Sequence, residues 1–127
     1  MFSHVMVGAD DVAASKHFYD ATLGVLGLAE GRIDDKGRVF YMTKTGVFAI
    51  SKPIDGGPAT CANGSTIGFA AESPEQADAW HEAGVASGGT AIEDPPGVRD
   101  GRLGKLYLAY LRDPAGNKLC ALYRVPA

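Results

Sequence analysis

The chain has 127 residues, of which 46% are hydrophobic and 21% charged, and its formal net charge is −3. This composition predicts one folded domain and excludes a largely disordered chain. The acidic balance disfavours a general nucleic-acid-binding role, and no apolar run approaches the roughly 20 residues of a membrane helix. No secretory signal is visible at the N-terminus, so we expect a cytoplasmic protein without nucleic-acid or membrane partners.

The first half of the chain reads as one βαβββ unit. Residues 2–8 alternate in hydrophobicity and are rich in valine, which predicts a strand. Asp11 is the expected N-cap of a helix that runs from Val12 to about Leu23 and carries Phe18 on its apolar face. Short strands are expected near residues 32–34, 38–43 and 47–51, separated by glycine-containing turns. Residues 53–63 are rich in proline and glycine and connect to the second half.

The second half begins with a predicted strand at residues 65–71. Ser73 is the expected cap of the next helix, because Pro74 follows at the first helical position and Gln76 at the capping-box position. Trp80 lies on the apolar stripe of this helix. Three strands are expected at residues 90–93, 105–112 and 118–124, with a turn at 113–117. Residues 94–104 are rich in proline and glycine, which predicts a loop long enough to serve as a lid or rim, a role that the sequence leaves open.

The second half repeats the pattern of the first with an offset of 62 residues. Residues 4–11 align with residues 66–73, and Phe18 then aligns with Trp80. Such self-similarity predicts duplicated units that bury their faces against each other. We expect a single domain over residues 1–127, with module one at about 1–52, the connection at about 53–63 and module two at about 64–127.

Three phrases lie in order around this duplication: His4-Val5, then Phe18-Tyr19-Asp20 followed by Leu23-Gly24, and residues 111–118, which read Leu-Arg-Asp-Pro-Ala-Gly-Asn-Lys. Together they resemble the vicinal-oxygen-chelate superfamily of glyoxalases, bleomycin resistance proteins and extradiol dioxygenases. The resemblance implies an α+β fold in which two βαβββ modules form a curled mixed sheet around one cleft. It also implies a homodimer.

The resemblance further implies a divalent metal in the cleft, bound by the first and last strands of each module. Those four positions fall on His4, Phe48, Thr66 and Cys120. Only His4 is a typical ligand, because phenylalanine cannot bind a metal, neutral threonine binds it poorly and a thiol is a soft ligand. We therefore expect no cofactor, and a divalent metal is disfavoured.

His4 is the candidate catalytic residue, as a general base or a ligand contact, although a purely structural role is an open alternative. The other candidates are expected to bind the substrate: Met6, Phe48, Ile50, Thr66, Gly68, Tyr107 and Cys120 as lining of a mostly apolar pocket, and Arg99 and Arg102 from the loop. Strand tyrosines and a small buried thiol also serve packing alone. Cys61 and Cys120 are both expected to be free thiols.

Two functional classes remain open at this point. The first is a protein that binds a small molecule in the inter-module cleft without the metal of the superfamily. The alternative is a glyoxalase-like lyase, isomerase or dioxygenase with an incomplete metal site centred on His4. The missing ligands favour the first class, because they remove the Lewis acid that metal-dependent catalysis needs. Metal-free acid/base chemistry by His4 remains an open form of the second class.

Overall fold

The computed structural model describes residues 1–127 as two units of similar element order. The first unit contains, in chain order, β1 (His4–Gly8), α1 (Val12–Val25), β2 (Arg32–Ile33), β3 (Val39–Met42) and β4 (Val47–Ser51). The second contains β5 (Ile67–Ala70), α2 (Pro74–Ala86), β6 (Thr90–Ala91), β7 (Gly97–Gly101), β8 (Gly104–Arg112) and β9 (Lys118–Arg124). The α+β class and the duplicated arrangement are thereby confirmed. Neither helix is long and apolar enough to cross a bilayer.

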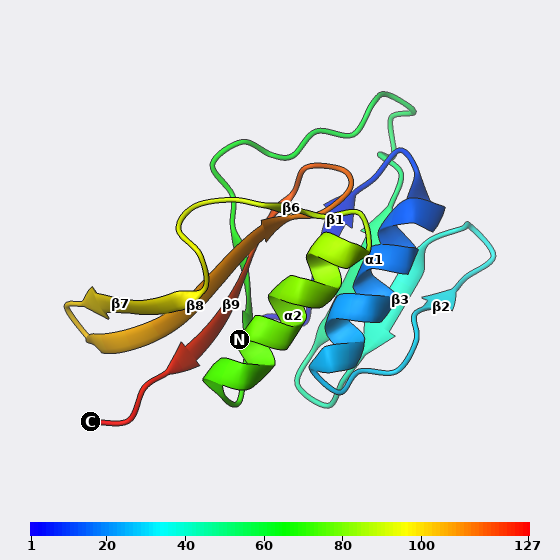
Figure 1. The fold of residues 1–127 in the computed structure, drawn as a ribbon. Coiled ribbons are helices and arrows are strands. Elements are labelled where there is room, and N and C mark those ends of the chain that lie inside the picture. Colours follow the sequence, from blue (N-terminus) through cyan, green and yellow to red (C-terminus); the bar gives the residue numbers. More distant parts are fainter.

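Each unit builds its own mixed sheet. The strand order is β1-β4-β3-β2 in the first sheet and β5-β9-β8-β6 in the second, and β1 and β5 each pair in parallel with the last strand of their unit. No strand pairing joins the two sheets. Figure 1 shows α1 and α2 side by side at the centre, with the first sheet to the right and the second to the left.

The prediction of a continuous loop over residues 94–104 is wrong. Gly97–Gly101 forms β7, which pairs antiparallel with β8, and Gly101 lies opposite Gly104 at the hairpin end. Gly104 adopts a φ of 112°, which a residue with a side chain rarely accepts. The proline and glycine content of this segment indicates a loop, whereas pairing with the long neighbouring strand makes it an extended edge.

One hydrophobic core runs through both units. Phe18 of α1 and Trp80 of α2 are fully buried and belong to the same cluster of 15 buried residues, as their equivalent positions in the repeat predict. The helices pack directly on each other. Gly84 of α2 makes this close approach feasible, because a Cβ atom there would lie 3.1 Å from the Phe18 ring. The two units therefore share one packed core.

The predicted helix starts are confirmed. The Asp11 side chain accepts a hydrogen bond from the Ala14 N–H at 3.0 Å, and Ser73 accepts one from the Gln76 N–H at 3.0 Å. These contacts satisfy backbone donors that have no partner within the helix. The Gln76 side chain also donates to the Val25 carbonyl at 3.2 Å, so the cap of α2 is tied to the end of α1.

The phrase at residues 113–117 ties the second unit to the first. The phenol of Tyr19 donates to Oδ2 of buried Asp113 at 2.5 Å. Asn117 donates through Nδ2 to the same carboxylate at 2.8 Å and to the Gly8 carbonyl at 3.1 Å. Two phrases that carry the family resemblance therefore meet here, and they serve structure rather than chemistry.

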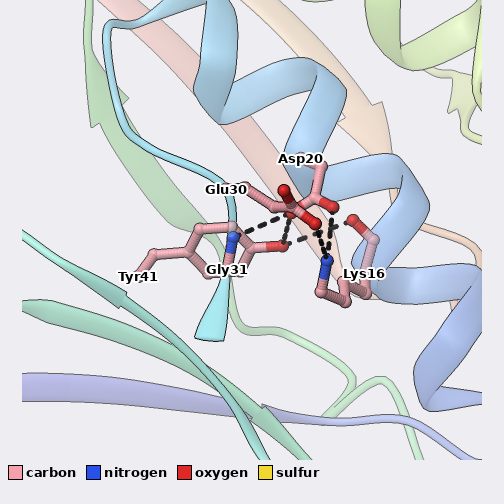
Figure 2. Close-up of polar contacts among 5 residues, drawn as sticks. All are labelled: Lys16, Asp20, Glu30, Gly31 and Tyr41. Atoms are coloured by element: carbon pink, nitrogen blue, oxygen red, sulfur yellow. Dashed lines mark hydrogen bonds and ion pairs between the residues drawn. The ribbon is translucent and has the colours of Figure 1, made fainter. Parts of the chain in front are cut away.

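Asp20, from the same helix phrase, anchors the segment that leads from α1 into the first sheet (Figure 2). Its carboxylate accepts hydrogen bonds from Lys16 Nζ at 2.7 Å, from the Gly31 N–H at 3.0 Å and from Tyr41 Oη at 2.8 Å. Lys16 also forms an ion pair with Glu30 at 2.9 Å. Burial, followed by the hydrogen bond to Asp20, raises the pKa of Tyr41, so its phenol remains a donor.

Candidate functional site

Strand register decides which side chains of the first sheet share a face. In the parallel pair of β1 and β4, His4 lies opposite Val47 and Met6 lies opposite Ala49. His4 and Met6 are exposed, whereas the alternate residue Val7 is buried in the core. His4 and Met6 therefore lie on the face that α1 leaves uncovered, which we call the free face.

Phe48 and Ile50 lie on the opposite, helix-covered face of the same sheet. Both are buried, and the ring centroid of Phe48 is 4.7 Å from that of Tyr19 in α1. The prediction that Ile50 lines a pocket with His4 is therefore wrong, whereas Phe48, although on the helix-covered face, still reaches a hollow that also contains His4. The cause is the composition of β4, which is apolar on both of its faces and so carries no alternation that distinguishes them.

The second sheet places Cys120 on its free face but turns Tyr107 away. Gly68 lies opposite Cys120, which in turn lies opposite Tyr110. Tyr107 occupies the alternate face and donates a hydrogen bond to Oδ1 of Asp78 in α2 at 2.6 Å. That bond is the main cause that raises the pKa of Tyr107 to about 12. The expectation that Tyr107 lines the pocket is thus wrong, because its phenol is engaged with a helix.

A hollow of about 410 Å³ lies between the two units, and we call it the inter-module hollow. It contains three of the predicted residues, His4, Phe48 and Gly68. Most of its lining is apolar, and His4 is the only side chain among the lining residues that carries an imidazole, carboxylate or cationic group. The full lining is Met1, Phe2, His4, Leu26, Leu28, Tyr41, Thr43, Thr45, Gly46, Val47, Phe48, Gly68, Phe69 and Ala70.

Sequence reasoning missed most of this lining. Leu26 and Leu28 follow α1, and Phe69 and Ala70 end β5, so they come together only through the packing of the two units. The one sequence feature that indicated the hollow was Phe2, an apolar residue close to His4 in the chain. In the structure its side chain is 70% exposed. An exposed aromatic side chain beside a hollow is a usual feature of a binding surface.

A larger open cavity, of about 920 Å³, lies on the first unit. Met6, Gly8 and Ser51 line it from the sheet, and residues of the inter-module connection such as Pro53 and Ala59 line it from the other side. Its remaining lining is mixed, with the cations Lys36, Arg38 and Lys52 beside apolar residues such as Ile54. Met6 therefore belongs to a cavity other than the one that contains His4.

The remaining predicted residues lie outside the inter-module hollow. Arg99 is in β7, where its guanidinium donates to the carbonyls of Gly97 and Asp94, both at 3.0 Å, and braces the strand. Arg102 is exposed in the β7–β8 turn. Both arginines therefore belong to the β7–β8 hairpin, and neither lines the inter-module hollow as predicted. Thr66 is exposed just before β5 and lines a separate small polar hollow.

The side chains present do not fit the metal that the resemblance implies. The register places Val47 and Ala49, rather than Phe48, on the face of His4 in the last strand of the first unit. Neither has a donor atom, and no group of three or more His, Cys, Asp or Glu side chains gathers anywhere in the structure. A metal of this class needs at least three protein ligands.

Both cysteines are free, as expected. Cys120 is 5% exposed, and burial raises the pKa of its thiol. Reactive cysteines have a lowered pKa and an electropositive, accessible environment. Cys120 is therefore a packing residue of the second sheet rather than a nucleophile.

Comparison with known proteins agrees with this architecture. The model of the Glyoxalase/Bleomycin resistance protein/Dioxygenase superfamily matches residues 1–121. The crystal structure of a glyoxalase/bleomycin resistance protein from Albidiferax ferrireducens T118 is 63% identical, covers 98% of this chain and 99% of that chain, and superposes with a TM-score of 0.95.

More distant structures share the fold alone. A glyoxalase-related enzyme from Fulvimarina pelagi is 20% identical over 98% of this chain and 88% of its own, with a TM-score of 0.73. A lactoylglutathione lyase from Agrobacterium tumefaciens is 23% identical over 96% of this chain and 92% of its own, with a TM-score of 0.65. None of the curated proteins matches the chain.

Proposed function

We propose, since this chain belongs to the Glyoxalase/Bleomycin resistance protein/Dioxygenase superfamily, that it binds a small molecule in the inter-module hollow without a metal. The observation that carries the proposal is the hollow itself. Its volume of about 410 Å³ lies within the roughly 300–1,000 Å³ of small-molecule sites, and its lining is mostly apolar with few polar groups. The absence of a fitting ligand set makes binding a better-supported role than metal-assisted chemistry.

His4 is the polar anchor of the proposed site. Its Nδ1 lies 2.7 Å from Oγ of Ser3, which holds the imidazole ring, while Nε2 has no hydrogen-bond partner in the protein. A ring nitrogen free in this way is available to donate to or accept from a polar atom of the ligand. The surrounding apolar residues, among them Leu28 and Phe69, would contact the rest of the molecule.

Gly68 provides a direct test, because a Cβ atom built there meets nothing within 4 Å. A leucine at this position would extend into the hollow without displacing the backbone, and glycine is a poor strand residue in any case. The probe is 8-anilinonaphthalene-1-sulfonate, an anionic dye with an apolar aromatic body, titrated by fluorescence. Wild-type protein should bind it saturably, and Gly68→Leu should weaken binding at least tenfold. Thr90→Leu is the control, since it adds the same side chain to an exposed strand position outside the hollow.

Equal dye affinity of the wild type and Gly68→Leu would contradict the proposal. The metal-dependent alternative is tested separately on the purified wild type. We expect negligible turnover of the methylglyoxal–glutathione hemithioacetal with added Zn²⁺, Ni²⁺ or Mn²⁺, and no stoichiometric metal by elemental analysis. About one metal ion per chain, lost in His4→Ala, would instead support a lyase-like centre.

We also propose a homodimer. Large apolar side chains remain exposed on the single chain, with Phe2 at 70%, Met42 at 66% and Leu103 at 90% exposed. A two-fold contact between copies is the commonest way for a soluble protein to cover such surface. Light scattering should give twice the 13.2 kDa chain mass at micromolar concentration. The two free thiols support a reducing, cytoplasmic location.

A further inference from the structure

Two cations face each other across the β8–β9 hairpin. Arg112 and Lys118 are direct cross-strand partners, so their side chains leave the sheet on the same face. Like charges directly opposite each other destabilise an antiparallel pair. Only Lys118 has a carboxylate partner, Glu93, which itself adopts a positive φ of 60°. Arg112 has no acidic partner, so the pair keeps an uncompensated positive charge.

The guanidinium of Arg112 is nevertheless held in place. Its Nη1 donates to the Gly116 carbonyl at 2.7 Å, a contact that fixes the orientation without neutralising the charge. The remaining N–H groups of the fork have no partner in the protein. A fixed guanidinium with free donors is the usual geometry for binding an oxyanion.

These two cations line a polar hollow of about 170 Å³, which we call the anion hollow. Its other walls contribute the Thr66 hydroxyl and the Asn63 amide, neither of which has a hydrogen-bond partner in the protein, and no carboxylate lines it. The volume lies below the roughly 300 Å³ at which sites for whole small molecules begin. A hollow of this size admits an ion or the charged end of a molecule.

We propose that the anion hollow binds a small oxyanion, a phosphate or sulfate group, between Arg112, Lys118 and Thr66. The ion would supply the negative charge that the cross-strand pair lacks, and the hydroxyl would donate to one of its oxygens. This site is independent of the proposed function, because it shares no lining residue with the inter-module hollow.

The test is calorimetric titration with inorganic phosphate, at constant ionic strength maintained with chloride. The wild type should bind one phosphate per chain. Arg112→Gln and Lys118→Gln should each weaken binding at least tenfold, and Thr66→Val several-fold. Arg124→Gln is the matched control, because Arg124 lies on the same face of β9 at its other end, and its affinity should equal that of the wild type.

Glu93→Gln gives the sharpest discrimination, since it removes the carboxylate that competes for Lys118 and should tighten phosphate binding several-fold. Thr66→Val and Glu93→Gln both keep the contact between Arg112 and Gly116, so the test holds even if Arg112→Gln fails to fold. If phenyl phosphate binds more tightly than inorganic phosphate, the ligand is the charged end of a larger molecule. If the two bind equally, the ligand is a free ion. Either result supports the site. The proposal would be overturned if phosphate showed no saturable binding in the chloride background, or if Glu93→Gln bound phosphate more weakly than the wild type.

Discussion

Gly24 and Gly84 both lie in the last turns of their helices, α1 and α2, but their surroundings are opposite. A Cβ atom at Gly24 would meet nothing within 4 Å. At Gly84 it would overlap Cδ1 of Leu111 and lie 3.1 Å from the Phe18 ring and 3.2 Å from Cγ2 of Thr22. The same substitution to alanine therefore tests helix propensity at one site and propensity plus packing at the other.

Alanine stabilises a helix relative to glycine by about 0.8–1.0 kcal/mol. This gain in helix propensity applies to both positions and is smaller where a helix end frays. Adding a methyl group to a filled core costs about 1–3 kcal/mol. Leu111 and Phe18 are fully buried, so neither can move aside without displacing further core residues. We expect Gly24→Ala to be neutral or stabilising by up to about 1 kcal/mol, and Gly84→Ala to be about 1–3 kcal/mol less stable than Gly24→Ala.

The measurement is urea unfolding of both variants and the wild type, followed by the fluorescence of Trp80. The difference between the two variants isolates the packing cost, because the propensity gain nearly cancels between them. In thermal unfolding this difference corresponds to several degrees, at about 4 °C per kcal/mol for a chain of this length. If Gly84→Ala proved as stable as Gly24→Ala, the close packing of α1 on α2 through Gly84 would be refuted.

The remaining predictions concern the partly buried carboxylate of Asp20 and the two thiols. Burial alone would raise the pKa of Asp20, but the hydrogen bonds from Lys16, Gly31 and Tyr41 outweigh it and hold that pKa below 3.8. Asp20 therefore stabilises the fold above its unfolded pKa of about 3.9, and this contribution disappears as the pH falls through the lower, folded pKa. We expect Asp20→Asn to lower the free energy of unfolding by about 1–3 kcal/mol at pH 7. In urea titrations the difference from the wild type should shrink below about pH 4. A difference that stayed constant with pH would contradict the role of the charge. In native thiol titration with a chromogenic disulfide, Cys61 should react readily and Cys120 slowly, because Cys120 is buried and its pKa is raised. Equal rates would show that the second sheet opens easily.

Local sequence was enough to predict most of the elements. Asp11 and Ser73 cap their helices because each has a short side chain that accepts from the backbone N–H three residues later, a contact that depends on no distant partner. The strands at residues 47–51 and 118–124 were predicted with their observed bounds, because apolar runs and turn residues mark both ends. The repeat also predicted that Phe18 and Trp80 would be buried at equivalent places.

The tertiary structure alone decided which face each strand shows to the helices. Period-2 alternation places Phe48 and Val47 on opposite faces but does not say which face is covered, and β4 is apolar on both. Packing of α1 made that choice, and it directed Phe48 and Ile50 to the core and His4 to the free face. Likewise β7 forms because the long strand β8 offers an unpaired edge. Residues 97–101 do not by themselves show that such an edge lies beside them, so their own sequence does not predict the strand.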